Sequence, residues 1–124
     1  MDEAVAQRYQ MIKPQAEEIV KRLQYEVAYL GFDPAEITIM SPQKAEYRLE
    51  RDPSNGDYSL VGDWRDERGM KIGSLLFHAD GSFFVEHDVI RPHPTKLRWF
   101  VEAVNAWGKD AEIKAEARLL PQPE

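Results

Sequence analysis

Apolar residues recur at spacings of three and four through the first 30 residues, which is the period of an α-helix with one buried face. Pro14 interrupts this stripe, and a proline inside a helix loses a hydrogen bond and clashes with the preceding turn. We therefore expect the main helix over residues 14–30, with proline at its first position and Gly31 at its end. Residues 1–13 then form a separate N-terminal arm or a kinked extension. The stripe comprises Val5, Tyr9, Ile12, Ala16, Ile19, Leu23, Val27 and Leu30.

The middle of the chain alternates between apolar and polar residues, which is the period of β-strands. Residues 44–51 alternate strictly, and a second strand over 57–64 follows a turn that contains proline and Asn-Gly. Strands over 70–78 and 83–90 flank a three-residue hairpin loop. That loop length places Phe77 opposite Phe83. The pattern thus predicts a four-stranded antiparallel meander.

The last third of the chain predicts a second helix and a final strand. A stiff connector with two prolines precedes apolar residues at helical spacing, so we expect a helix over 96–107 that begins after Thr95 and ends at Gly108. Residues 110–119 alternate again, and their alternating charges match those of 44–51, which predicts that these two strands are neighbours. A frayed tail is expected at 120–124.

The resulting order α-β-β-β-β-α-β predicts one α+β domain over 1–124, with both helices on one face of a mostly antiparallel sheet. The hairpin register assigns Leu75, Phe77, Phe83, Val85 and His87 to the helix face. The opposite face then carries a candidate binding patch with a charged rim, which is typical of a surface that contacts a partner. Two other interpretations stay open: a register shifted by one residue, or a patch covered by the N-terminal arm. The patch comprises Ile72, Leu76 and Phe84, rimmed by Glu86 and Asp88.

Composition narrows the possible functions. Acidic residues outnumber basic ones by 22 to 16, giving a net charge of −6, which argues against binding nucleic acid or an anionic membrane. The absence of cysteine excludes disulfides, thiolate metal sites and cysteine nucleophiles. The first residues carry two acids and no apolar secretory segment, so we expect a cytoplasmic location. The longest uncharged run, 72–79, is far shorter than the ~20 residues of a membrane span.

The polar residues between 78 and 93 form no recognisable catalytic or metal-binding motif. Strand alternation points Glu86 and Asp88 away from His87, and His93 lies far along the chain from His78. We therefore assign no catalytic residue, no cofactor and no metal site.

These observations favour a small, acidic, intracellular module that binds another protein and has no catalytic activity. The long apolar stripe of the first helix also suggests a homodimer, because it extends past the expected sheet. The alternative is a small-molecule-binding protein or an enzyme, with a pocket between helix 96–107 and the sheet and with His87 and Arg91 at its mouth.

Overall fold

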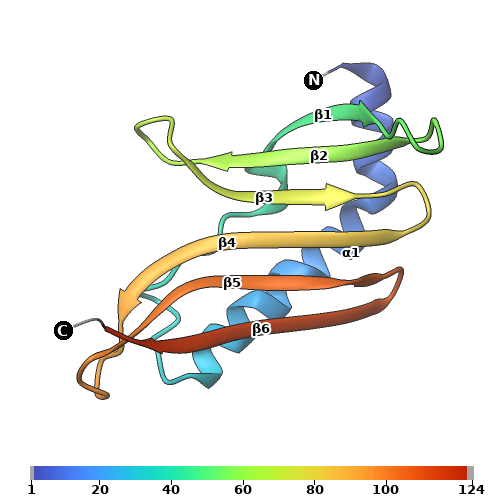
Figure 1. Cartoon of the computed structure of the whole chain (residues 1–124). Helices are drawn as coiled ribbons and strands as arrows, with labels where there is room; N and C mark the ends of the chain where they lie inside the picture. The colour runs from blue at the N-terminus through green and yellow to red at the C-terminus, as the bar shows by residue number, and fades with distance from the viewer. Residues whose placement is uncertain (1, 123–124) are drawn as a thin grey trace.

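One long helix lies behind a single antiparallel sheet in the computed structural model, which describes residues 2–122 (Figure 1). Each strand pairs with the next along the chain, so the sheet order is β1-β2-β3-β4-β5-β6. The predicted frayed tail is wrong at Leu120 and Pro121, which belong to β6, whereas residues 123–124 lie outside the described part of the chain. The elements are α1 (Glu3–Tyr29), the 3₁₀ helix η1 (Pro42–Lys44), β1 (Glu46–Arg51), β2 (Tyr58–Arg65), β3 (Lys71–Phe77), β4 (Ser82–Pro92), β5 (Trp99–Lys109) and β6 (Glu112–Pro121).

Helix α1 continues through Pro14, so the predicted separate N-terminal arm is wrong. Asp2 caps the N-terminus of the helix, and its carboxylate accepts a 2.7 Å hydrogen bond from the Ala4 amide. Val5 and Tyr9, which precede Pro14 in the chain, are buried against the sheet, and so is Ala16, which follows it. Pro14 itself lies on the exposed side of the helix. Packing of the whole stripe therefore outweighs the one helical hydrogen bond that proline removes.

The predicted helix over 96–107 is wrong, because most of this segment forms β5. A β-bulge shifts the register between Val101 and Val104, and both residues are fully buried. The bulge adds one residue to the strand, so two inward-facing positions stand three apart instead of two. This spacing imitates the period of a helix, which explains the false signal. The turn before β5 is held by the His93 ring, whose Nδ1 accepts a 2.8 Å hydrogen bond from the Lys96 amide.

The predicted neighbours 44–51 and 110–119 lie at opposite edges of the sheet, as β1 and β6. Matching charge patterns misled this prediction because the charges of β1 find partners elsewhere. Arg48 pairs with Asp63 on the adjacent strand β2 and with Glu50 on its own strand. The matching signs of these two strands thus indicate two solvated faces, not neighbours within one sheet.

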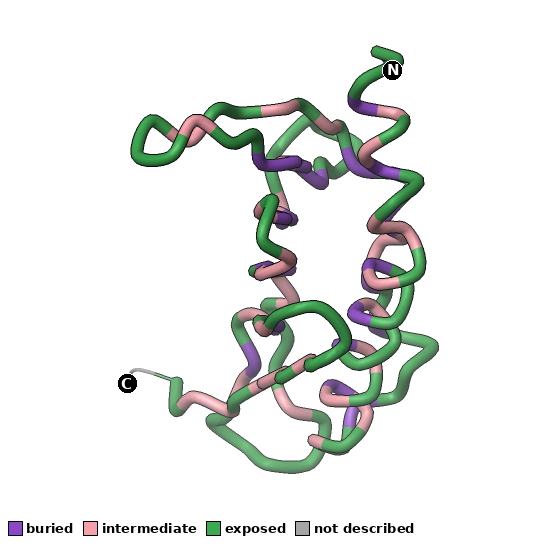
Figure 2. Tube along the Cα trace, turned by 90° about the vertical axis from the view of Figure 1, so that its right-hand side faces the viewer, coloured by how far each residue is buried: buried purple, intermediate pink, exposed green. Residues whose placement is uncertain are grey.

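The register predicted for the β3–β4 hairpin is confirmed, with Phe77 opposite Phe83 and Leu75 opposite Val85. All four side chains are buried on the face that α1 covers. Figure 2 shows the two layers edge-on, with the buried residues of the helix and of the sheet turned toward each other. The class is therefore α+β with an antiparallel sheet. The predicted four-stranded meander with a second helix and a final strand is wrong, because the sheet has six strands and one helix covers it.

Candidate functional site

Four apolar side chains form a row across the face of the sheet that α1 does not cover, called here the open face. Val61 pairs with Leu76, Leu76 with Phe84, and Phe84 with Trp107. Side chains of directly paired residues lie on the same face, and adjacent strands are about 4.8 Å apart, so the row is about 14 Å long. Phe84 is 42% and Trp107 36% exposed, while Val61 and Leu76 are half-buried. We call these four residues the apolar row.

Charged residues border the apolar row. Its ends meet cations, because Arg48 pairs with Val61 on β2 and Lys114 pairs with Trp107 on β5. The next row of the open face is polar and mainly acidic, so the apolar row has a polar rim, as binding surfaces do. This acidic border contains Glu46, Asp63, Ser74, Glu86, Asn105 and Glu116 in cross-strand register.

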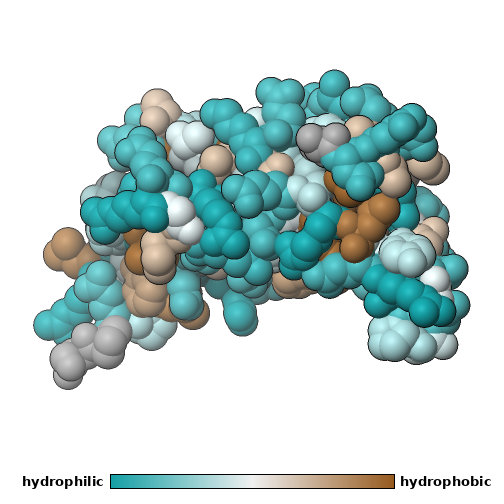
Figure 3. Space-filling view, turned by 90° about the horizontal axis from the view of Figure 1, so that it is seen from above, coloured by the Kyte–Doolittle hydropathy of each residue, from teal (hydrophilic) through white to brown (hydrophobic). Residues whose placement is uncertain are grey.

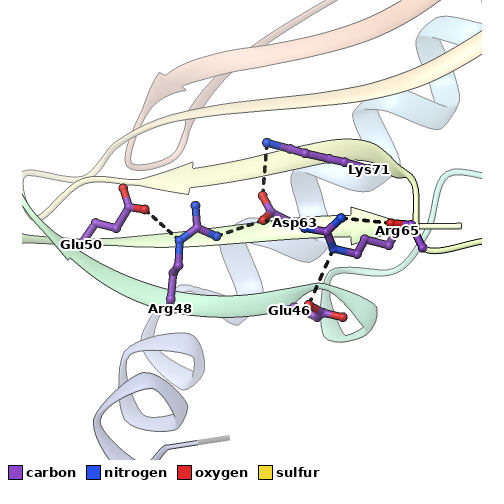
Figure 4. Close-up of polar contacts among 7 residues, drawn as sticks. Glu46, Arg48, Glu50, Asp63, Arg65 and Lys71 are labelled. Atoms are coloured by element: carbon purple, nitrogen blue, oxygen red, sulfur yellow. Dashed lines mark hydrogen bonds and ion pairs between the residues drawn. The ribbon is translucent and has the colours of Figure 1, made fainter.

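Within the acidic border, Asp63 is only 8% exposed and is surrounded by three cations (Figure 4). Its carboxylate oxygens lie 3.0 Å from Arg48 Nη1, 3.3 Å from Lys71 Nζ and 3.8 Å from Arg65 Nη2. Burial acts to raise the pKa of Asp63, but its contacts with Lys71 and Arg48 outweigh burial and lower the pKa. Arg48 also contacts Glu50 at 2.8 Å. The network therefore links β1, β2 and β3 as balanced ion pairs, and we assign it a structural role.

On the helix face, His87 is a hydrogen-bonded core residue. It is 3% exposed and packs on Trp64, with ring centroids 5.1 Å apart. Its Nε2 faces the Met40 amide donor at 3.4 Å, which leaves Nδ1 to donate to the Asp88 carbonyl at 2.8 Å. Burial lowers the pKa of His87, and the hydrogen bond to Asp88 opposes this shift. The ring is thus neutral, and both of its nitrogen atoms are engaged.

A cavity of about 370 Å³ lies beside the β4 bulge and brings His87 and Arg91 together. The bulge falls between Asp88 and Arg91 and holds Ile90 at a φ of 43°, which a β-branched residue seldom adopts. The predicted position of this pocket is wrong, because no helix exists over 96–107 to form its wall. The remaining lining comes from Ile37, Thr38, Asp66, Ile72, Asp88, Val89 and Ile90.

A larger cavity of about 590 Å³ lies between α1 and the tips of the β3–β4 and β5–β6 hairpins. Two polar side chains of α1 tie the helix to the strands here. Arg8 donates to the Tyr58 carbonyl at 2.9 Å, and Gln15 donates to the Asp110 carbonyl at 2.7 Å. No sequence signal marked this cavity, because its walls come from three segments that are far apart in the chain. Its apolar lining includes Met11, Ile12, Pro14, Ala79, Ala111 and Ile113.

The structure brings together only part of the predicted patch. Leu76 and Phe84 are cross-strand neighbours, and Glu86 lies in the acidic border beside them. Ile72 and Asp88 lie instead at the bulge cavity, toward the other end of β3 and β4.

Trp107 was missed as part of the open face because its segment was assigned to a helix. In the structure, buried Val104 and Ala106 alternate with less buried Asn105 and Trp107, but apolar and polar residues do not alternate here in the sequence, so no sequence signal placed Trp107 on a strand.

No group of three or more histidine, aspartate or glutamate side chains within residues 2–122 is arranged to hold a metal ion. The helical part of the same range contains no segment of the length and apolarity that crossing a bilayer requires. Comparison of the chain with protein-family models, with curated proteins and with solved structures finds no match.

Proposed function

We propose that the protein is a binding module whose open face docks another protein. The observation that carries this proposal is the apolar row, which leaves Phe84 and Trp107 more than one-third exposed at the middle of the sheet. Large aromatic side chains at the centre of a surface contribute much of the energy of protein interfaces. Helix α1 supplies the core on the opposite face, so these aromatic side chains are free to contact a partner.

The surroundings of the apolar row define the chemistry of the partner. The row is about 14 Å long at about 4.8 Å per strand, which fits a short apolar ridge such as one face of a helix. The acidic border beside it favours a partner that carries basic side chains next to that ridge. Its acidic member Glu86 is partly exposed on β4, in reach of such cations.

The test is capture from the native cell with wild-type protein and two variants, followed by titration of each purified captured protein. The open-face variant, Phe84→Ser with Trp107→Ser, removes the two exposed aromatic side chains of the apolar row. The matched control, Met11→Ser with Tyr29→Ser, removes two exposed apolar side chains of α1. We expect the captured protein to bind wild type and control equally and the open-face variant at least tenfold more weakly. Equal affinity for all three proteins would contradict the proposal.

A second candidate function is binding of a small molecule in the bulge cavity, because the cavity combines charged Arg91, Asp88 and Asp66 with apolar walls. A ligand that carries both a carboxylate and an amine suits this mixture of charges. Thermal-shift measurements with a set of amino acids test it. A rise in melting temperature in wild type that Arg91→Gln abolishes would support this function, and no rise with any of them would contradict it.

A further inference from the structure

The two edges of the sheet, β1 and β6, differ in length and in how their charges are used. Edge strands present unpaired backbone N–H and C=O groups, which are able to pair with another strand. Strand β1 has six residues and β6 has ten. Figure 3, which views the molecule from the β1 end, shows a mainly hydrophilic surface with a limited apolar area. Because β6 is the longer of the two edge strands, it offers more unpaired backbone N–H and C=O groups than β1.

Charges of alternating sign follow the open face of β6, and they are complementary to themselves. In order along the strand they are Glu112, Lys114, Glu116 and Arg118. A two-fold axis through Ala115, perpendicular to the sheet, would pair each residue with the one equally far on the other side of Ala115. Lys114 then faces Glu116 of a second copy, and Glu112 faces Arg118. All four cross-strand pairs join opposite charges, which stabilises antiparallel pairing.

The same charges reject the adjacent register. An axis through Glu116 places Glu116 opposite itself and Lys114 opposite Arg118, so every pair of facing charges repels, and Glu112 faces the apolar Leu120. A register shift of one residue would move the charged side chains of one copy to the opposite face from those of the other. Only shifts of two residues keep both sets of charges on the open face, so the registers about Ala115 and Glu116 are the ones to compare. The charge pattern thus favours one alignment and disfavours its neighbour.

The helix-facing residues of β6 are compatible with this alignment. Ile113, Ala115 and Ala117 are half-buried and pack at the margin of the core. About the same axis, Ala115 meets its own copy and Ile113 meets Ala117. The small alanine side chains let the strands approach, and the second copy covers apolar surface that the edge leaves half-exposed.

The charges of β6 are only partly engaged within the chain, with Glu112 opposite Lys109 on β5 and Glu116 beside Arg118. Across its own sheet, Lys114 faces Trp107 and Glu116 faces Asn105, so neither has a charged partner on β5. Glu116 contacts Arg118 at 2.6 Å on the same strand, where the two side chains are 42% and 75% exposed. On β1, by contrast, Arg48 is held by Asp63 and Glu50.

We propose that β6 is a homodimer interface, in which two copies pair antiparallel about Ala115 and join their sheets into one. The proposal is independent of the docking function assigned to the open face. It replaces the homodimer expected from the α1 stripe, because Val5, Leu23 and Val27 are buried within a single chain. The two-fold axis closes the assembly at two copies. It also places both apolar rows on one side of the joined sheet, where a bivalent partner would contact both.

Charge reversal tests this interface by sedimentation equilibrium at tens of micromolar in low salt. Lys114→Glu with Arg118→Glu makes the open face of β6 wholly acidic, and Glu112→Lys with Glu116→Lys makes it wholly basic. We expect wild type at twice the 14.3 kDa chain mass, each variant at 14.3 kDa, and a dimer again when the two variants are mixed. The control Lys21→Glu with Arg22→Glu reverses two exposed cations of α1 and should stay dimeric.

Wild-type protein at 14.3 kDa throughout would overturn the proposal, as would a dimer that persists in both reversed variants. Hydrogen exchange on wild-type protein gives an independent measurement. Exchange of the outward-facing β6 amides should slow as the protein concentration rises, while exchange in β1 stays constant. Exchange in β6 that does not depend on concentration would also overturn the proposal.

Discussion

Trp64 and Trp107 lie on opposite faces of the same sheet, and their surroundings show how α1 divides the molecule. Trp64 is fully buried under the helix, and its indole N–H donates to the Ser41 carbonyl at 2.9 Å. Trp107 is 36% exposed at the end of the apolar row. The same residue type thus stabilises the fold on the helix face and offers contact area on the open face.

The two faces also differ in how they accommodate a buried titratable group. His87, on the helix face, is kept neutral by desolvation, which outweighs its hydrogen bond to the Asp88 carbonyl. Asp63, on the open face, stays ionised because Arg48 and Lys71 compensate its charge. A buried polar group is tolerated when it is hydrogen-bonded, and a buried charge when it is paired. Solvent reaches the cations of the open face, so they stay hydrated while they compensate the buried charge of Asp63.

Removal of the Trp64 side chain should have the largest effect on stability. Trp64→Ala leaves a cavity between α1 and the sheet, and we expect a loss of about 3–5 kcal/mol in the free energy of unfolding. Urea denaturation followed by circular dichroism measures this loss. A change below about 1 kcal/mol would show that the helix face is not the core of the protein.

Gly73→Ala should have the next largest effect. A Cβ atom at this position would lie 2.6 Å from the Glu86 carbonyl oxygen and 2.8 Å from Trp64 Cε3. Neither the β4 backbone nor the buried indole is free to move aside, so we expect a loss of about 1–3 kcal/mol. Gly69→Asn is the control, because Gly69 has open space around it and asparagine tolerates its φ of 82°. Equal losses in both variants would contradict the role of close packing at Gly73.

Acid should destabilise the protein through His87. The pKa of His87 is lower in the folded protein than in the unfolded chain. At a pH between these two pKa values, the unfolded chain therefore binds a proton at His87 that the folded protein does not bind. The contribution of His87 to stability is therefore fully present above its unfolded pKa near 6.5. It is lost as the pH falls from there toward the folded pKa. The slope from this one group is at most about 1.4 kcal/mol per pH unit. Urea titrations at several pH values measure it, and His87→Gln should flatten the slope; an unchanged slope would contradict the assignment.

Asp63→Asn should weaken the open-face network by about 1 kcal/mol, because its cations are partly hydrated and screened. Arg48 and Lys71 are about half exposed, so they remain solvated after the carboxylate charge is removed. The loss should shrink as salt is added, since salt already screens these pairs in wild type. The control Lys21→Gln removes an exposed pair with Glu18 on α1 and should change stability by less than about 0.5 kcal/mol. A loss that salt leaves unchanged would contradict the electrostatic origin.

The sequence predicted those parts of the fold where local geometry determines the pairing. The three-residue loop fixed Phe77 opposite Phe83, and the face assignment of β3 and β4 followed from it. The charges of β1 and β6 did not predict which strands pair, because Arg48 of β1 forms ion pairs with Asp63 on the adjacent strand and with Glu50 on its own strand. At Pro14, the local preference to break a helix was overridden by packing that only the folded chain reveals.

Irregular backbone explains most of what was missed at the candidate site. The bulge in β5 gave Val101 and Val104 a helical spacing and so hid Trp107 from the open face. The bulge in β4 separated Asp88 from the rest of the predicted patch. Leu76 and Phe84 were predicted together because one regular hairpin contains both. Cavities were beyond prediction from local pattern, since each is assembled from segments distant in sequence.

Truncation of Trp107 should have the smallest effect on stability and gives the sharpest comparison with Trp64. Trp107→Ala removes a side chain that solvent already reaches, so the loss is limited to cross-strand contacts with Phe84 and Lys114, roughly 0.2–1 kcal/mol. Urea denaturation beside Trp64→Ala, in the same buffer, measures both tryptophans on one scale. If Trp107→Ala costs as much as Trp64→Ala, the aromatic groups of the open face belong to the core. The apolar row would then have no free surface for a partner, and the docking function would lose its main support.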